Sequence, residues 1–225
     1  VPGSPVVFNI LVTPAPTSLA KAGGDGQTGV VDATLAVSPT VSVRDAVGNP
    51  VPGIAVAFTI VAGGGSLSAG GALPGGVTQV TDAAGHASVS WRLGTLAGPG
   101  ALVASAAGMG SVSFSATGVA GPASSMVLVS GDGQTAGAGS LLQPFVVRVA
   151  DAFGNSVSGA SVQWTRLWGS GTLGSANSST SEAGIAQVGY TLAGQAGDET
   201  VRAELPGVAG ASVLFTAHAT TRALA

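Results

Sequence analysis

One stretch of sequence occurs twice, and this duplication constrains the fold more than any other feature. The stretch VSVRDAVGNPVPGIAVAF at Val41 to Phe58 returns as VRVADAFGNSVSGASVQW at Val147 to Trp164. In both copies, alternating apolar residues flank a D-A-x-G-N segment. Alternation with a period of two indicates a half-buried strand, and Asp, Gly and Asn favour a tight turn. Each copy therefore predicts two strands joined by a turn, as in the core of a β-sandwich.

Aromatic residues mark the centre of each predicted core. They share the apolar parity of their strands, which places them on the inward face. The residues expected to be buried at equivalent places in the two sandwiches are Phe58, Trp91 and Phe114 in the first repeat and Trp164, Tyr190 and Phe215 in the second.

The composition suits an all-β chain and argues against several kinds of partner. Charged residues make up 8% of the chain, Gly numbers 37, and the hydrophobic class reaches 45%. This mixture favours β-branched strands joined by glycine turns. The net charge is −3 with scattered Lys and Arg, so nucleic acid and anionic membranes are not expected as partners. No apolar run approaches the about 20 residues of a membrane helix, so no membrane insertion is expected.

Two domains of about 100 residues each are predicted from the repeat. The predicted boundaries are 15–119 for the first Ig-like domain and 120–220 for the second, followed by a tail at 221–225. The join between the repeats is short and contains Pro122, which favours a stiff connection. Cys is absent, which excludes disulfide frameworks and thiolate metal sites.

A third copy of the closing-strand pattern lies in residues 1–14. The pattern is VSFSA from Val112, VLFTA from Val213 and VVFNI from Val6. The copy at Val6 comes before the first domain. It is therefore either the last strand of a preceding domain or a strand that pairs with a neighbouring subunit. We expect the second, because strand addition makes a directional head-to-tail joint. The residues expected to enter the neighbouring sheet are Val6, Phe8, Ile10 and Val12.

Short motifs recur in the same order along the repeats. They are GDGQT from Gly24 and from Gly131, V-x-D-x-x-G-N, T-D-A-x-G-x-A from Thr81, and W-R-L-G-T-x-A-G from Trp91. Together they resemble the group 1 bacterial Ig-like domains of invasin- and intimin-like surface proteins. The second repeat departs from the pattern, with Ser181-Glu182 for Thr-Asp and Tyr190-Thr-Leu for Trp-Arg-Leu. The resemblance covers essentially the whole chain and implies two tandem, antiparallel Ig-like β-sandwiches used as an extracellular stalk or spacer. It implies no active site and no cofactor.

The acidic residues of the repeated turns are weak candidates for calcium ligands, because Ca²⁺ prefers carboxylate oxygens. They are Asp25 and Asp132 in the GDGQT segments, and Asp45 and Asp151 in the D-A-x-G-N segments. Each turn offers one carboxylate, so the favoured interpretation is that these residues accept hydrogen bonds within their turns. The two His residues lack the converging groups of a catalytic site, so no enzyme is predicted.

Trp168 is an aromatic residue gained in the second repeat, near a position where the first repeat has Ala62. It predicts a contact with a ligand or glycan, or else a cover for the end of the sandwich or for the seam between domains. The second interpretation is favoured.

The sequence therefore predicts a non-enzymatic, extracellular structural protein, a rod-like segment of a bacterial surface fibre or adhesin stalk. Its expected partners are copies of itself or neighbouring Ig-like domains, and a host or cell-surface ligand. Two alternatives stay open: a ligand- or glycan-binding adhesin module, and a spacer within a larger secreted enzyme.

Overall fold

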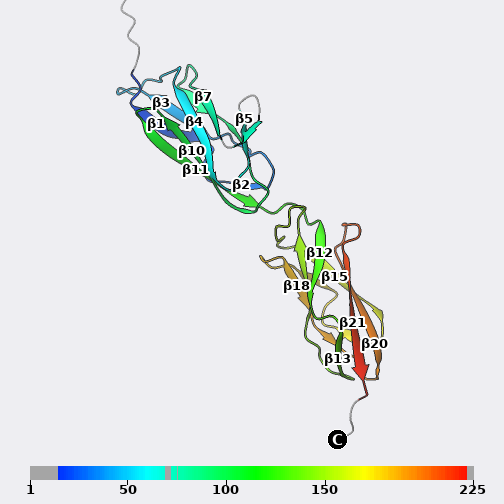
Figure 1. Cartoon of the computed structure of the whole chain (residues 1–225). Coiled ribbons are helices and arrows are strands. Elements are labelled where there is room, and N and C mark those ends of the chain that lie inside the picture. The colour runs from blue at the N-terminus through cyan, green and yellow to red at the C-terminus, as the bar shows by residue number, and fades with distance from the viewer. Residues whose placement is uncertain (1–14, 69–71, 75, 222–225) are drawn as a thin grey trace, which may run out of the picture. The chain divides into compact units, whose positions relative to one another are not determined.

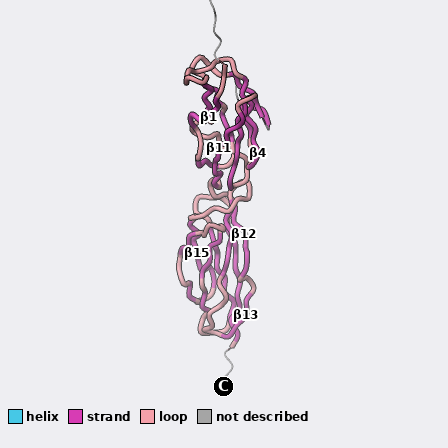
Figure 2. The backbone as a smooth tube through the Cα atoms, turned by 90° about the vertical axis from the view of Figure 1, so that its left-hand side faces the viewer, coloured by secondary structure: helices cyan, strands magenta, loops and turns pink. Residues whose placement is uncertain are grey.

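The structure is a computed structural model that describes residues 15–68, 72–74 and 76–221. The chain divides into two compact units (Figure 1). The boundary lies between Val119 and Ala120. Among the described residues all regular elements are strands, joined by loops and turns (Figure 2). The predicted extra strand at Val6 to Val12 and the residues after 221 lie outside the described residues.

Unit 1 holds two main sheets and one small sheet. The three-stranded sheet has the order β1 (Ser18–Gly23), β3 (Thr40–Arg44), β8 (His86–Ser88). The five-stranded sheet has the order β2 (Gln27–Val30), β11 (Gly110–Val119), β10 (Gly98–Ala106), β4 (Ala55–Ala62), β7 (Gly76–Val80). The small sheet is formed by β6 (Ala72–Pro74), β5 (Ser66–Ser68) and β9 (Ser90–Arg92).

Unit 2 repeats the same arrangement. Its three-stranded sheet has the order β12 (Ser125–Ser130), β14 (Phe145–Ala150), β18 (Ile185–Val188). Its five-stranded sheet has the order β13 (Gln134–Gly137), β21 (Ser212–Thr220), β20 (Gly197–Glu204), β15 (Ser161–Trp168), β17 (Asn177–Ser179). A two-stranded sheet pairs β16 (Thr172–Leu173) with β19 (Tyr190–Thr191). The predicted all-β class is confirmed, because two sheets enclose one core in each unit.

The cores are built on the aromatic residues that strand parity placed inside. Phe58, Trp91, Phe114, Tyr190 and Phe215 are fully buried, and Trp164 is 2% exposed, which confirms the prediction for all of them. In unit 2, the Phe145 ring stacks on Phe215 with ring centres 4.7 Å apart and on Tyr190 at 5.5 Å. Aromatic burial and stacking of this kind account for much of the energy of a small sandwich core.

The D-A-x-G-N turns have the predicted conformation. Gly48 and Gly154 have φ values of 90° and 86°, a left-handed region that glycine enters at little steric cost. Asp45 accepts hydrogen bonds from the backbone N–H groups two and four residues later, at 3.0 and 2.8 Å. Asp151 accepts the equivalent pair, both at 2.9 Å. Each Asp thus closes its turn through its own carboxylate.

The sheets are antiparallel, as expected, apart from one parallel pair in each unit, which departs from the expected antiparallel arrangement. Strand β2 runs parallel to β11, with Gln27 beside Ala116, and β13 runs parallel to β21, with Gln134 beside Ala217. The cause is the GDGQT turn, where the chain leaves one sheet and enters the other. Its glycines have positive φ, which permits the sharp crossing. The strand after the turn, β2 or β13, then runs beside the last strand of the unit, β11 or β21, in the same direction.

Replacing Trp164 with Ala is expected to lower the free energy of unfolding by about 3–5 kcal/mol, the range for a large aromatic residue removed from a core. The matched control is Trp168→Ala in the same strand. Its side chain is 70% exposed, so the expected change is within about 0.5 kcal/mol. Equilibrium urea unfolding of the whole chain measures both. A loss below about 1 kcal/mol for Trp164→Ala would contradict the assigned core position.

Candidate ligand-contact surface

The Asp residues of the GDGQT turns connect each turn to the closing strand. Asp25 accepts hydrogen bonds from the backbone N–H of Ser115 at 2.8 Å and from its hydroxyl at 3.2 Å. Asp132 accepts the same pair from Thr216, at 2.7 and 2.9 Å. The hydrogen bond from Lys21, with that from the Ser115 backbone, lowers the pKa of Asp25 to about 2. The backbone N–H of Thr216 likewise lowers the pKa of Asp132.

The Gln residue of the same motif holds the loop that follows strand β2 in unit 1 and β13 in unit 2. Gln27 donates to the carbonyl oxygens of Gly24 and Val37 at 2.8 and 2.7 Å, and accepts from the N–H of Val37 at 3.0 Å. Gln134 makes the same three bonds, to Gly131 and to both backbone groups of Gln143. The motif is therefore a structural device that holds the crossing point in place in both units.

The calcium candidates thus have protein partners in the structure. Burial tends to raise the pKa of Asp45 and of Asp151, but hydrogen bonds from the Asn four residues later and from turn N–H groups outweigh it, and both pKa values are lowered. For Asp151, the backbone N–H of Gly121 also donates at 2.9 Å and lowers the pKa. Over the ranges that the structure describes, no group of three or more His, Cys, Asp or Glu residues is placed to hold a metal ion. Asp25 and Asp45 belong to unit 1, and Asp132 and Asp151 to unit 2.

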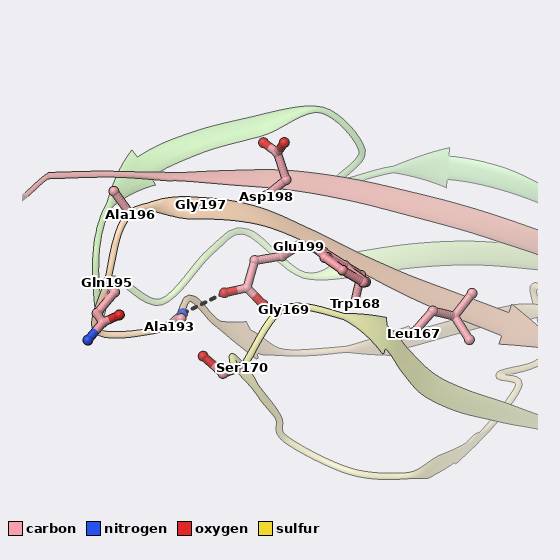
Figure 3. Close-up of a pocket in the computed structure, with 10 residues that line it drawn as sticks. All are labelled: Leu167, Trp168, Gly169, Ser170, Ala193, Gln195, Ala196, Gly197, Asp198 and Glu199. Atoms are coloured by element: carbon pink, nitrogen blue, oxygen red, sulfur yellow. Dashed lines mark hydrogen bonds between the residues drawn. The ribbon is translucent and has the colours of Figure 1, made fainter.

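Unit 2 contains a buried carboxylate, Glu199, that was not predicted. Glu199 is 2% exposed and accepts a hydrogen bond from the N–H of Ala193 at 2.8 Å (Figure 3). It accepts a second one from the N–H of Gly171 at 3.0 Å. It also accepts from the hydroxyl of Tyr190. Burial, the hydrogen bond to Glu199 and the charge of Glu199 raise the pKa of Tyr190. This carboxylate therefore fixes the two loops that meet at the end of β15.

Unit 1 fills the same space in a different way. Gly100 pairs with Ala116 as Glu199 pairs with Ala217, so Gly100 and Glu199 are equivalent. A Cβ atom added to Gly100 would lie 3.2 Å from Cζ2 of Trp91, because the indole ring occupies that space. The paired change from Trp and Gly in one repeat to Tyr and Glu in the other was the available sequence signal.

Trp168 lies at the end of β15 with 70% of its surface exposed, so it is not buried against its own unit. A hollow of about 420 Å³ adjoins it, between the segment 167–170 and the segment 193–199 (Figure 3). A second hollow, of about 370 Å³, lies over β13, β20 and β21. Asp198 and Glu199, at the start of β20, contribute to the lining of both hollows.

The second hollow contains a pair of titratable side chains. Nδ1 of His218 lies 2.6 Å from Oδ1 of Asp198, and these side chains are 50% and 81% exposed. The two residues face each other directly across β20 and β21. Of the residues singled out in the sequence, the structure brings Trp168 and Asp132 to this one sheet, where Asp132 contacts β21.

Solved structures with a similar fold include two bacterial proteins. InvD of Yersinia pseudotuberculosis matches with 19% identity and a TM-score of 0.53, covering 92% of this chain and 58% of that one. FdeC, an adhesin of Escherichia coli, matches with 19% identity and a TM-score of 0.50, covering 94% of this chain and 67% of that one. No protein-family model and no curated protein matches the chain. The likeness confirms the predicted fold, two tandem Ig-like β-sandwiches.

Replacing Glu199 with Ala is expected to lower the free energy of unfolding by about 2–4 kcal/mol, because buried N–H and O–H donors lose their acceptor. The neighbouring acid Asp198 is the control. Its side chain is 81% exposed, so Asp198→Ala is expected to change stability by no more than about 0.5 kcal/mol. Urea unfolding compares the two variants. Equal losses would show that Glu199 does not hold the loops.

Proposed function

We propose that this chain is a tension-resisting spacer segment of a bacterial surface protein, without catalytic activity. The observation that supports this function is the parallel pairing of β2 with β11 and of β13 with β21. The fold likeness to FdeC, a protein described as an adhesin, supports an extracellular position. No helix suited to crossing a bilayer occurs among the described residues.

The parallel pairs respond to tension in a particular way. In each unit the strand after the GDGQT turn, β2 or β13, lies near the beginning of the unit. The last strand, β11 or β21, lies at its end. Once β1 has separated from β3, force on the two ends pulls β2 and β11 in opposite directions along their length. The ladder bonds between parallel strands are evenly spaced, so the load is shared among them. Antiparallel strands pulled apart from one end would instead lose these bonds one after another.

The GDGQT turn reinforces the parallel pair where the load arrives. In unit 1 the N–H of Gly26 donates to the carbonyl oxygen of Ser115 at 3.0 Å, and the carboxylate of Asp25 accepts from Ser115. In unit 2 the N–H of Gly133 donates to Thr216 at 2.9 Å, and Asp132 accepts from the same residue. Hydrogen bonds to a charged group are roughly twice as strong as neutral ones. The motif thus adds hydrogen bonds that resist the same shear next to the paired residues of the two parallel strands.

Replacing Asp132 with Ala is expected to raise the unfolding rate of unit 2 under tension about tenfold or more, because a hydrogen bond to a charged group contributes about 1.5–3 kcal/mol. Single-molecule pulling through the chain ends measures this rate, since forced unfolding follows the unfolding barrier. Unit 1 provides the internal reference. The control is Glu182→Ala, an exposed acid of the same unit.

Two outcomes would contradict this assignment. Equal rates for Asp132→Ala and Glu182→Ala would remove the proposed reinforcement. Addition of EDTA to the unsubstituted chain is expected to leave the rate unchanged, because protein donors already occupy Asp132. An increase that matches Asp132→Ala would make Asp132 a metal ligand instead.

The head-to-tail joint is a finer part of the proposal. Val6, Phe8, Ile10 and Val12 have the alternation of a closing strand and would pair with the sheet of a neighbouring module. Deleting residues 1–13 is therefore expected to yield folded monomers that no longer assemble into chains, as measured by light scattering and electron microscopy. Undiminished assembly of the truncated chain would rule out this joint and leave the spacer function in place.

A further inference from the structure

Unit 2 carries a groove with aromatic and polar groups on the outer face of its five-stranded sheet. The groove is the surface formed by two rows of side chains that extend from Trp168 to His218, and hollows of about 420 and 370 Å³ border it. We propose that this groove binds a neutral saccharide chain. The proposal goes beyond the spacer function and does not depend on it.

The strand register arranges the side chains of the groove in two rows. In the first row, Trp168 lies opposite Thr200, which lies opposite Thr216, whose hydroxyl donates to Asp132. In the second row, Asp198 lies opposite His218, which lies opposite Thr135. Residues two apart on one strand face the same side of a sheet, so the two rows are neighbours on one surface.

The opposite face of the sheet is closed, which fixes the direction of the groove. Val201 on β20 is 1% exposed and Phe215 on β21 is fully buried in the core. In Figure 3 the side chain of Glu199 points toward Ala193, whereas that of Asp198 points away from it. The groups of both rows are therefore presented outward, and the bonds to Glu199 fix the loop beside Trp168 before any ligand arrives. Such pre-organisation reduces the ordering cost of binding.

The chemistry of the groove suits a sugar. A sugar ring has one face of C–H groups, which packs on an exposed aromatic ring such as Trp168, and a rim of hydroxyls. Threonine hydroxyls both donate and accept, a carboxylate accepts, and a His ring offers either role. The charge of Asp198 is already close to a ring nitrogen of His218, at 2.6 Å. This pairing favours a neutral ligand over a cation.

Unit 1 shows that the fold does not require these groups. At the equivalent register positions, Ala62 lies opposite Ala101 and Pro99 lies opposite Thr117. Unit 1 thus has no aromatic platform, carboxylate or imidazole at these positions. The hollow at the corresponding loops is bordered largely by glycines, among them Gly63, Gly64 and Gly65. Trp168, Asp198 and His218 are therefore particular to unit 2, whereas Thr135 and Thr216 correspond to Thr28 and Ser115 of unit 1.

The test uses the whole chain and an immobilised set of neutral oligosaccharides built from glucose, galactose, mannose, N-acetylglucosamine and N-acetylgalactosamine. At least one is expected to bind with a Kd of about 1 mM or tighter. Titration calorimetry with that oligosaccharide is expected to show a loss of about tenfold or more for Trp168→Ala, as for a contact hot spot. Asp198→Asn and His218→Ala are expected to weaken binding as well.

The matched control is Phe153→Ala. Phe153 is 45% exposed in the D-A-x-G-N turn of the same unit and does not line the groove, so this variant should bind as the unsubstituted chain does. The proposal is overturned if no oligosaccharide of the set binds, or if Trp168→Ala and Phe153→Ala behave alike. It is also overturned if an arginine- and lysine-rich peptide binds in a Trp168-dependent manner while the saccharides do not, because the groove would then be a cation site.

Discussion

The crossing of the chain from one sheet to the other is the constraint on which the rest of each unit depends. The crossing is made within GDGQT, by glycines in left-handed conformations and by Asp and Gln side chains that bond to backbone groups on either side. It allows one continuous segment to supply an edge strand to both sheets, β1 in one and β2 in the other. The closing strand then gains a parallel neighbour, and both sheets are held over one core. Without that crossing, the two layers would share fewer covalent and hydrogen-bonded links.

The two units share this crossing but fill one part of their cores with different side chains. The space beside β10 in unit 1 is filled by the indole of Trp91, whereas unit 2 places the hydroxyl of Tyr190 and the carboxylate of Glu199 in the equivalent space. Both solutions satisfy close packing, because each fills the volume with complementary groups. The second solution also ties two loops together, and those loops border the exposed Trp168. A change in the core is thus connected with a change on the surface.

Sequence periodicity reports which side of a strand faces inward, and this is why the buried aromatic residues were predicted correctly. The turns were predicted from the local chemistry of Asp, Gly and Asn. Periodicity does not report which strands are neighbours, so the parallel pairing of β2 with β11 was not foreseen. Periodicity also classifies each position only as apolar and inward or polar and outward. Glu199 has the parity of the core but a charged side chain, and only its neighbours Tyr190, Gly171 and Ala193 make its burial tolerable. Its only linear sign is the paired change from Trp91 and Gly100 to Tyr190 and Glu199 between the repeats, and that change does not show that the two residues are in contact.

The different fillings of the two cores also bear on the fidelity of folding. Tandem domains of similar sequence are prone to exchange strands with each other while they fold. A β20 strand placed in unit 1 would bring Glu199 against the indole of Trp91, which has no space for it, and a β10 strand placed in unit 2 would leave the hydroxyl of Tyr190 without its carboxylate acceptor. Both exchanges bury a mismatched polar group, which is costly. The pair of substitutions therefore acts as a lock that keeps each strand with its own unit.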